Sequence, residues 1–128
     1  EAVLRPYGVG STQWAVLYEL ANHGPTTQRD LGLTLHLERA TLSGVVATLV
    51  RKGLIDQVSD PSDQRQRMLR MTAAGTGLWN ELPDAFAVVR AIALEGSSTD
   101  ELEVAIRVLK AATQRLTDHI PADPRPAR

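Results

Sequence analysis

The sequence contains no cysteine in its 128 residues. Disulfide bonds, thiolate metal ligands and switching by oxidation of a thiol are therefore excluded. Aromatic residues make up only 4% of the chain, so we expect an aliphatic core. No run of apolar residues approaches the roughly 18 that a membrane-spanning helix needs, and no signal peptide is visible. We expect a cytoplasmic protein with no membrane partner.

The chain also has little net charge. Its formal value of −1 argues by itself against a nucleic-acid-binding protein. The distribution is more informative, because residues 28–70 hold seven basic and five acidic side chains. The basic excess lies in the middle of the chain and is small. Charge is compatible with DNA binding but does not establish it.

No site for catalysis or metal binding stands out. The three histidines, His23, His36 and His119, are far apart and lack an HxxxH-like spacing. Asp60 and Asp63 are better explained as residues that stabilise a turn than as a catalytic pair. We find no nucleophile–base arrangement and no glycine-rich phosphate loop. We therefore expect no enzymatic activity, no cofactor and no metal.

Hydrophobic periodicity predicts a mainly helical chain. Three helices are expected within residues 11–52, of which the second is short and ends near His36. A long helical stretch follows from Ala73, with a kink or break at Leu82-Pro83, before a last helix. The residues expected to cap these helices are Ser11 or Thr12, Thr26 or Thr27, and Thr99, and Glu38 or its neighbour is expected to start the third helix.

A change of period predicts a β-hairpin after the third helix. Residues 54–58 and 67–72 have the pattern of two short strands, and Asp60-Pro61-Ser62-Asp63 has the composition of a turn. The third helix combines an apolar stripe with an exposed face of small side chains, which suits the major groove of DNA. The stripe is Leu42, Val45, Val46 and Leu49. The exposed face is Arg39, Ala40, Ser43, Gly44, Ala47 and Thr48. This order predicts a winged helix-turn-helix.

The stretch from Gly8 to Gly75 resembles the MarR family of bacterial transcriptional regulators. The matching segments are GVGSTQWAVLYELANHGPTTQRDLGLTL, LERATLSGVVATLVRKGLI and DPSDQRQRMLRMTAAG. The wing motif is the most specific, with Asp60-Pro, Asp63-x-Arg65 and Leu-x-Met-Thr-x-x-Gly75 in register. The expected organisation is the end of an N-terminal dimerisation helix and a linker at 1–10, a winged helix-turn-helix at 11–72, dimerisation helices at 73–120 and a disordered tail at 121–128.

The resemblance implies a set of DNA contacts. Residues 38–52 would be the recognition helix, Arg65 would enter the minor groove, and Arg67 would lie near phosphate. Thr27 and Gln28, at a helix N-terminus, would contact phosphate. Asp63 would hold the wing by pairing with a nearby arginine, and Asp60 would stabilise the same turn. The expected DNA-binding residues are Thr27, Gln28, Arg39, Ala40, Thr41, Ser43, Gly44, Arg65 and Arg67.

Three positions depart from the family pattern. His36 stands where the family usually has glycine, and a non-glycine residue there costs about 1 kcal/mol if its φ is positive. Gly44 stands where many members carry a base-reading arginine, which shifts direct readout to residues 39–41. Gln64 replaces a common wing arginine. We therefore expect wing contacts, backbone contacts and DNA shape to contribute more to binding.

The leading hypothesis is a homodimeric, ligand-responsive repressor that binds a palindromic operator in double-stranded DNA. A small aromatic or phenolic effector would bind at Tyr7, Trp14, Tyr18 and Phe86, although core packing explains the helical aromatic residues, including Trp79, more simply. Two other hypotheses remain open. The domain is a protein-interaction or dimer scaffold with weak DNA affinity, or it is a small-molecule-binding protein or enzyme.

Overall fold

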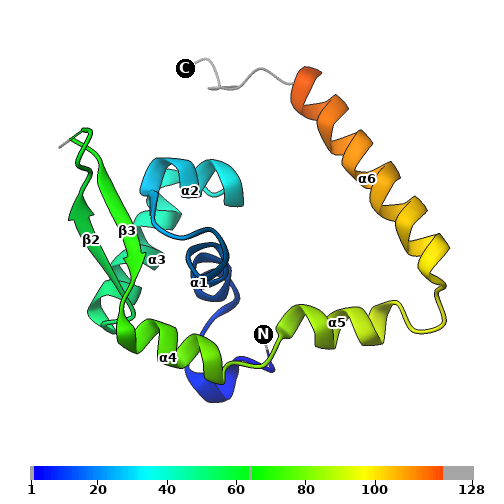
Figure 1. The fold of residues 1–128 in the computed structure, drawn as a ribbon, viewed down its shortest axis with the longest axis horizontal. Coiled ribbons are helices and arrows are strands. Elements are labelled where there is room, and N and C mark those ends of the chain that lie inside the picture. Colours follow the sequence, from blue (N-terminus) through cyan, green and yellow to red (C-terminus); the bar gives the residue numbers. More distant parts are fainter. Residues whose placement is uncertain (1, 64, 120–128) are drawn as a thin grey trace. The chain divides into compact units, whose positions relative to one another are not determined.

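The computed structural model describes residues 2–63 and 65–119, and the chain divides into two compact units, Glu1–Ala85 and Phe86–Arg128. The second unit holds α6 (Thr99–His119) and all of α5 (Ala85–Ala93) except its first residue, Ala85 (Figure 1). The elements of the first unit are the 3₁₀ helix η1 (Arg5–Tyr7), α1 (Ser11–His23), β1 (Thr26–Thr27), α2 (Gln28–Leu35), α3 (Arg39–Arg51), β2 (Ile55–Ser59), β3 (Arg67–Met71) and α4 (Ala73–Glu81).

This order confirms a mainly helical winged helix-turn-helix with a hairpin wing. Helix α4, with which the expected dimerisation segment 73–120 begins, contacts α1 and β3 and lies in the first unit. The role of residues 73–120 in dimerisation stays a prediction. The expected departure at Gln64, the expected end of the dimerisation helices at residue 120 and the tail 121–128 lie outside the described residues. No helix in the described part of the chain is long and apolar enough to cross a membrane.

The helix caps were predicted with mixed success. Thr27 caps α2 as expected, because its Oγ1 accepts the backbone N–H of Asp30 at 3.1 Å. The prediction for α1 was wrong: Gly10 is the cap residue, and its carbonyl oxygen accepts the N–H of Trp14 at 2.9 Å. Because Ser11 is already helical, its hydroxyl does not take the capping position.

The cap expected at Thr99 was wrong by one residue. Ser98 Oγ accepts the N–H of Glu101 at 3.1 Å, and Glu101 Oε1 accepts the N–H of Ser98 at 3.0 Å. These reciprocal bonds form a capping box, in which each side chain satisfies one backbone donor at the start of the helix. They also lower the pKa of Glu101, chiefly through the Ser98 backbone N–H and then through its hydroxyl.

The core of the first unit is aliphatic, as the composition predicts. Leu42, Val46 and Leu49 on α3 are buried, while Val45 of the same stripe is half-buried. The segment before α1, expected to be a linker, contributes buried Leu4 and Val9 to the core. The remaining buried apolar residues are Trp14, Val16, Leu17, Leu20, Leu31, Leu54, Ile55 and Leu69.

The sheet has three antiparallel strands in the order β1-β3-β2. Strands β2 and β3 form the expected wing, with Ile55 opposite Met71 and Ser59 opposite Arg67. Strand β1 was not predicted, because two threonines are too short to show alternation. It places Thr26 opposite Leu69 and Thr27 opposite Met68, and so joins the start of α2 to the wing.

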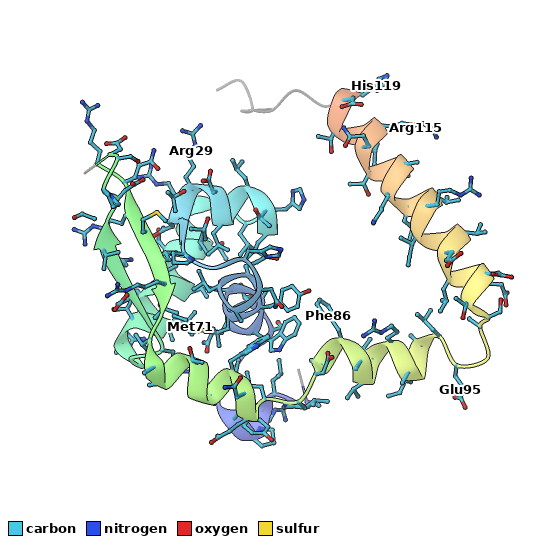
Figure 2. All side chains as sticks on the ribbon, viewed as in Figure 1. Arg29, Met71, Phe86, Glu95, Arg115 and His119 are labelled. Carbon is cyan, nitrogen blue, oxygen red and sulfur yellow. The ribbon has the colours of Figure 1, made fainter. Side chains whose placement is uncertain are left out.

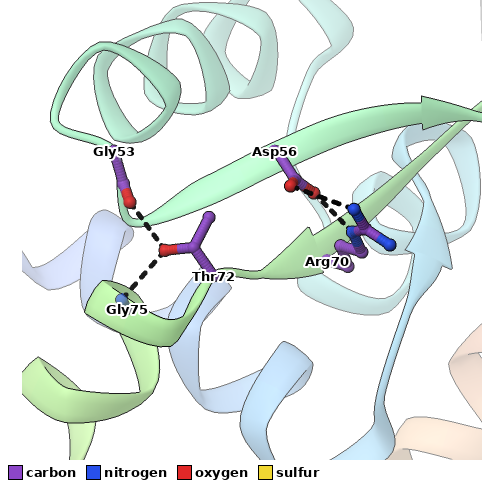
Figure 3. Close-up of polar contacts among 5 residues, drawn as sticks. All are labelled: Gly53, Asp56, Arg70, Thr72 and Gly75. Carbon is purple, nitrogen blue, oxygen red and sulfur yellow. Dashed lines mark hydrogen bonds and ion pairs between the residues drawn. The ribbon is translucent and has the colours of Figure 1, made fainter.

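The base of the wing is held by side chains of its own motif (Figure 3). Thr72 Oγ1 donates to the carbonyl oxygen of Gly53 at 2.6 Å and accepts the N–H of Gly75 at 3.0 Å. Gly75 is buried, and a Cβ added there would clash with the carbonyl group of Leu54. The Thr-x-x-Gly spacing therefore lets α4 begin against the first residues of the wing.

The helical stretch after the wing breaks where the sequence predicted. Helix α4 ends at Glu81 and α5 begins at Ala85. Leu82 is extended, with φ −65° and ψ 139°, because the ring of Pro83 disfavours helical geometry in the preceding residue.

Candidate nucleic-acid interface

A groove of about 710 Å³ lies between α2, the start of α3 and the wing. Six residues expected to bind DNA line it, namely Thr27, Gln28, Arg39, Ser43, Arg65 and Arg67. Ala40, Thr41 and Gly44 do not line it; they lie on the exposed surface of α3. The helix-turn-helix and the wing thus bring residues from three separate segments together.

The groove is cationic. Arg29, Arg39, Arg65 and Arg67 line it, and no Asp or Glu is among its described lining residues. Within residues 2–63 and 65–119, the ion pairs are His23 with Glu19 and Arg70 with Asp56, so the charges of these four arginines are not neutralised by a described carboxylate. All four residues are exposed. The groove therefore suits a polyanion.

Arg29 was missed by the sequence analysis. It lies in the first turn of α2 and projects outward from that helix (Figure 2). A cation in the first turn opposes the helix dipole, which favours negative charge there. This locally unfavourable placement is a signal of function that the sequence carried.

Helix α3 offers a surface of small side chains beside this groove. Ala40, Thr41 and Ala47 are exposed, and a Cβ added at Gly44 would meet no atom within 4 Å. Thr48, expected on the same face, is half-buried. Its hydroxyl donates to the carbonyl oxygen of Gly44 at 3.0 Å, so its proton is already used within the helix.

Gln28 and Ser43 are joined across the helix-turn-helix. Gln28 Nε2 donates to Ser43 Oγ at 2.9 Å, over a separation of 15 residues. Thr27, beside Gln28, is only 9% exposed, and its hydroxyl oxygen is occupied by the cap of α2. At this end of α2, Gln28 is therefore more accessible than Thr27.

The wing tip is held by its two aspartates. Asp60 Oδ1 accepts the Ser62 backbone N–H at 2.9 Å and the Ser62 hydroxyl at 2.7 Å. These bonds, the backbone one foremost, lower the pKa of Asp60. Asp63 does not form the expected ion pair with a described arginine side chain: its Oδ1 accepts the backbone N–H of Arg65 at 3.0 Å. That contact leaves the Arg65 guanidinium free to reach outward.

The turn before α3 has the strained geometry considered in the sequence analysis. His36 has φ 53° and ψ 42°, in the left-handed region. Its backbone N–H still closes α2 by donating to the carbonyl oxygen of Leu33 at 3.4 Å. The cost of about 1 kcal/mol expected for a non-glycine residue therefore applies.

The aromatic residues of the first unit pack against one another. The ring centroids of Trp14 and Tyr18 lie 5.3 Å apart, and those of Trp14 and Trp79 lie 5.8 Å apart. Tyr7 is 41% exposed on η1, and Phe86 belongs to the second unit. Core packing accounts for the trio, and an effector pocket at these residues stays a prediction. No group of three potential metal ligands occurs among the described residues.

The chain is similar in sequence to known helix-turn-helix transcriptional regulators. A family model described as MarR family matches residues 7–66. The HTH-type transcriptional regulator YkoM of Bacillus subtilis is 30% identical over 108 residues, which cover 84% of this chain and 70% of YkoM. The HTH-type transcriptional repressor NicR of Pseudomonas putida is 32% identical over 68 residues, covering 53% of this chain and 43% of NicR. A third relative, YwoH of Bacillus subtilis, is covered over 57% of its length.

Solved structures share the fold. PcaV, a transcriptional regulator of Streptomyces coelicolor solved with its natural ligand, is 32% identical with a TM-score of 0.71, covering 83% of this chain and 75% of that one. A MarR mutant from E. coli, solved with operator DNA, has a TM-score of 0.77 at 20% identity and covers 87% of this chain and 80% of that one. AbsC of Streptomyces coelicolor, a MarR family regulator, reaches 0.84 at 20% identity, covering 93% and 82%.

Proposed function

Because the chain belongs to the MarR family, we propose that it is a homodimeric transcriptional regulator that binds a palindromic operator in double-stranded DNA. One observation carries this proposal: the groove between α2, α3 and the wing is lined by four arginines and by no described carboxylate. Contacts from arginine to phosphate supply affinity and fix the orientation of a protein on the duplex.

The elements around the protein's arginine-lined groove fit the major and minor grooves of DNA. Helix α3 presents small exposed side chains, which allow close approach to the base edges of the major groove. Arg65 lies at the exposed wing tip, where it would reach the adjacent minor groove. Arg29 and Arg67 would contact phosphate. Gly44 offers no side chain to a base, so readout by shape gains weight.

The second unit supports the proposed dimer. Val89 and Ile92 on α5 are 61% and 75% exposed, and Leu109 and Leu116 on α6 are 67% and 61% exposed. Apolar side chains at such density mark surfaces that another molecule covers. A second copy related by a twofold axis would cover them symmetrically. It would also place two recognition helices about 34 Å apart, as a palindromic site requires.

The proposal is tested by fluorescence anisotropy with duplexes from the protein's own promoter region and with scrambled duplexes, over a salt series. We expect Arg29→Ala and Arg67→Ala to weaken binding to every duplex and to reduce the salt dependence by about one ion per lost phosphate contact. Arg65→Ala should weaken binding through its lost minor-groove contact. Arg5→Ala is the matched control, because Arg5 is exposed on η1 outside the groove. Absence of sequence-preferring binding at low salt would instead favour a scaffold with weak DNA affinity.

We also propose that an aromatic effector lowers DNA affinity, as expected of a repressor that responds to a ligand. Support comes from PcaV, whose structure holds its natural ligand, and from NicR, a repressor. The proposed site is near Trp14 and Tyr18, with Tyr7, in the first unit. Titration with simple aromatic acids should quench tryptophan fluorescence and release bound DNA. Quenching without release would separate ligand binding from regulation.

A further inference from the structure

The hydrogen bond between Gln28 and Ser43 joins the two helices of the helix-turn-helix through their side chains. Gln28 is the first residue of α2, Ser43 lies in the N-terminal half of α3, and both line the arginine-lined groove. The amide nitrogen of Gln28 donates to Ser43 Oγ at 2.9 Å. The bond restricts where the serine oxygen lies, while the hydroxyl keeps its proton and one lone pair for a further partner.

Both residues of this bond lie on parts of the chain that packing holds in place. Thr27, directly before Gln28, is buried, pairs with Met68 of the wing and caps α2. Leu42, directly before Ser43, is buried in the core. The bond therefore forms between two fixed backbones, so that only the side-chain torsions of the pair remain to be restricted.

Ser43 differs from Thr48, which lies five residues further along α3. The Thr48 hydroxyl donates to the carbonyl oxygen of Gly44, a bond that serine and threonine form back into their own helix. Ser43 forms no such bond to a described residue, and its side chain is exposed. An exposed serine without a partner samples three staggered rotamers. Among the described residues, Gln28 is thus the one whose side chain holds the Ser43 hydroxyl in one of them.

We propose that Gln28 is a positioning residue for DNA recognition: it holds the Ser43 hydroxyl in one rotamer at the groove, so that the base preference of Ser43 depends on Gln28. This inference rests on the proposed function. Preorganisation reduces the entropy lost on binding, and holding one of three rotamers beforehand strengthens a contact up to about threefold. A base that makes the contact gains this factor and a base that does not make it gains nothing, so the effect is on specificity.

The surroundings of Ser43 favour a base over a phosphate as its partner. Ala40 lies three residues before it, Gly44 directly follows it and Ala47 lies four residues after it, all of them exposed and short. Such neighbours let the helix backbone approach the floor of the major groove, which brings a short side chain within reach of base edges. The Ser43 hydroxyl would then meet a base with its proton or with its remaining lone pair.

The first measurement uses the full chain without DNA. Three-bond couplings between the Hα and Hβ protons of Ser43 report its χ1 rotamer by NMR. We expect couplings of a single rotamer in the wild type and couplings averaged over several rotamers in Gln28→Met, which keeps the length of the side chain but removes the amide. Gln66→Met is the matched control, because Gln66 lines the same groove and no hydrogen bond between the described side chains joins it to Ser43. Averaged couplings in the wild type would overturn the inference.

The second measurement compares base preferences. A preferred duplex is selected from a random library, and every single base-pair substitution of it is measured by competition. The proteins are the wild type, Ser43→Ala, Gln28→Met, the control Gln66→Met and the double variant Ser43→Ala with Gln28→Met, each checked for folding by its melting temperature. We expect Ser43→Ala to remove a preference of about fivefold at one position of each half-site. Gln28→Met should reduce the same preference about two- to threefold, and Gln66→Met should leave it unchanged.

The double variant separates positioning from direct contact. If Gln28 acts through Ser43, Gln28→Met changes no base preference once residue 43 is alanine. A uniform loss of affinity in Gln28→Met with unchanged preferences would make Gln28 a phosphate contact, and a changed preference that persists in the double variant would make it a base contact. Unchanged preferences in Ser43→Ala would mean that Ser43 reads no base. Each of these results overturns this inference alone, whereas a wild type without any sequence preference overturns the proposed function with it.

Discussion

At the scale of single residues, two glycines in α4 lie in different surroundings, one packed against the backbone and one exposed to solvent. Gly75 is buried, and a Cβ added there would clash with the carbonyl group of Leu54. Gly77 is exposed in the same helix, and a Cβ there would meet no atom within 4 Å. Neither residue has a positive φ. The first glycine is therefore required by contact, and the second is not.

We predict that Gly75→Ala destabilises the first unit by about 1–3 kcal/mol, the range for forcing extra volume into a packed site. Gly77→Ala should be neutral or stabilising by about 0.5–1 kcal/mol, because alanine favours a helix interior over glycine. Urea unfolding of both variants measures the difference. Equal stability of the two would contradict the close approach of α4 to Leu54.

Residues that act alone were easier to predict than residues that act through a partner. The exposed face of the third helix predicted Arg39, and the resemblance to the MarR family implied Arg65 and Arg67; all three line one groove. The bond between Gln28 and Ser43 joins α2 to α3, and neither side chain signals the other in the sequence. Such pairing depends on how two helices pack, which hydrophobic periodicity describes only coarsely.

At the scale of secondary structure elements, α6 begins with a charged cap. The pKa of Glu101 is lowered because its carboxylate accepts hydrogen bonds from the Ser98 backbone N–H and hydroxyl. A carboxyl whose pKa falls on folding stabilises the folded form above its unfolded pKa. That stabilisation is lost as pH falls through the lower, folded pKa.

We predict that the first turn of α6 frays in acid, as the pH falls through the lowered pKa of Glu101 and its carboxylate becomes protonated. Amide hydrogen exchange, corrected for intrinsic rates, should show reduced protection of residues 98–102 in acid. Glu101→Gln is the matched control, since glutamine fills the same capping position without titrating. Ser98→Ala should speed exchange about fivefold at neutral pH. Unchanged protection in acid would contradict the role of the carboxylate.

Elements of different length were predictable to different degrees. Helices α1, α2 and α3 and the two wing strands follow from periodicity, and α4 ends where Pro83 forces the preceding residue out of helical geometry. Strand β1 could not be predicted, because two residues carry no period. Cap positions shifted by one residue at α1 and α6, where several neighbouring residues could each have served.

At the scale of the whole molecule, the second unit leaves apolar side chains exposed on both of its helices. Val89 and Leu109 are more than half exposed, and so are Ile92 and Leu116. The apolar period of α5 and α6 was visible in the sequence. The partner that covers these side chains was not predictable, because the same apolar sequence pattern arises whether a helix packs on its own core or on a second copy of the chain.

We predict that Val89→Asp and Leu109→Asp each convert the proposed dimer to a monomer, because a charge placed in an apolar interface loses its hydration. Analytical ultracentrifugation measures the change, and binding to a palindromic duplex should weaken in parallel. Val50→Asp is the control for the oligomeric state alone, since Val50 is 39% exposed on α3, the proposed recognition helix of the first unit. Dimers that persist in both α5 and α6 variants would refute the proposed interface.

The two-residue strand β1 also bears on how the proposed effector would act. Thr27 pairs with Met68 of the wing, and the same residue caps α2. The two walls of the groove thus share one residue, Thr27, which should hold them at a fixed separation. In the proposed dimer, an effector that leaves this pairing intact should move the two walls together and change the distance between the two subunits, not the width of one groove. Spin labels across a single groove should keep their separation when an effector binds, while labels on opposite subunits should not.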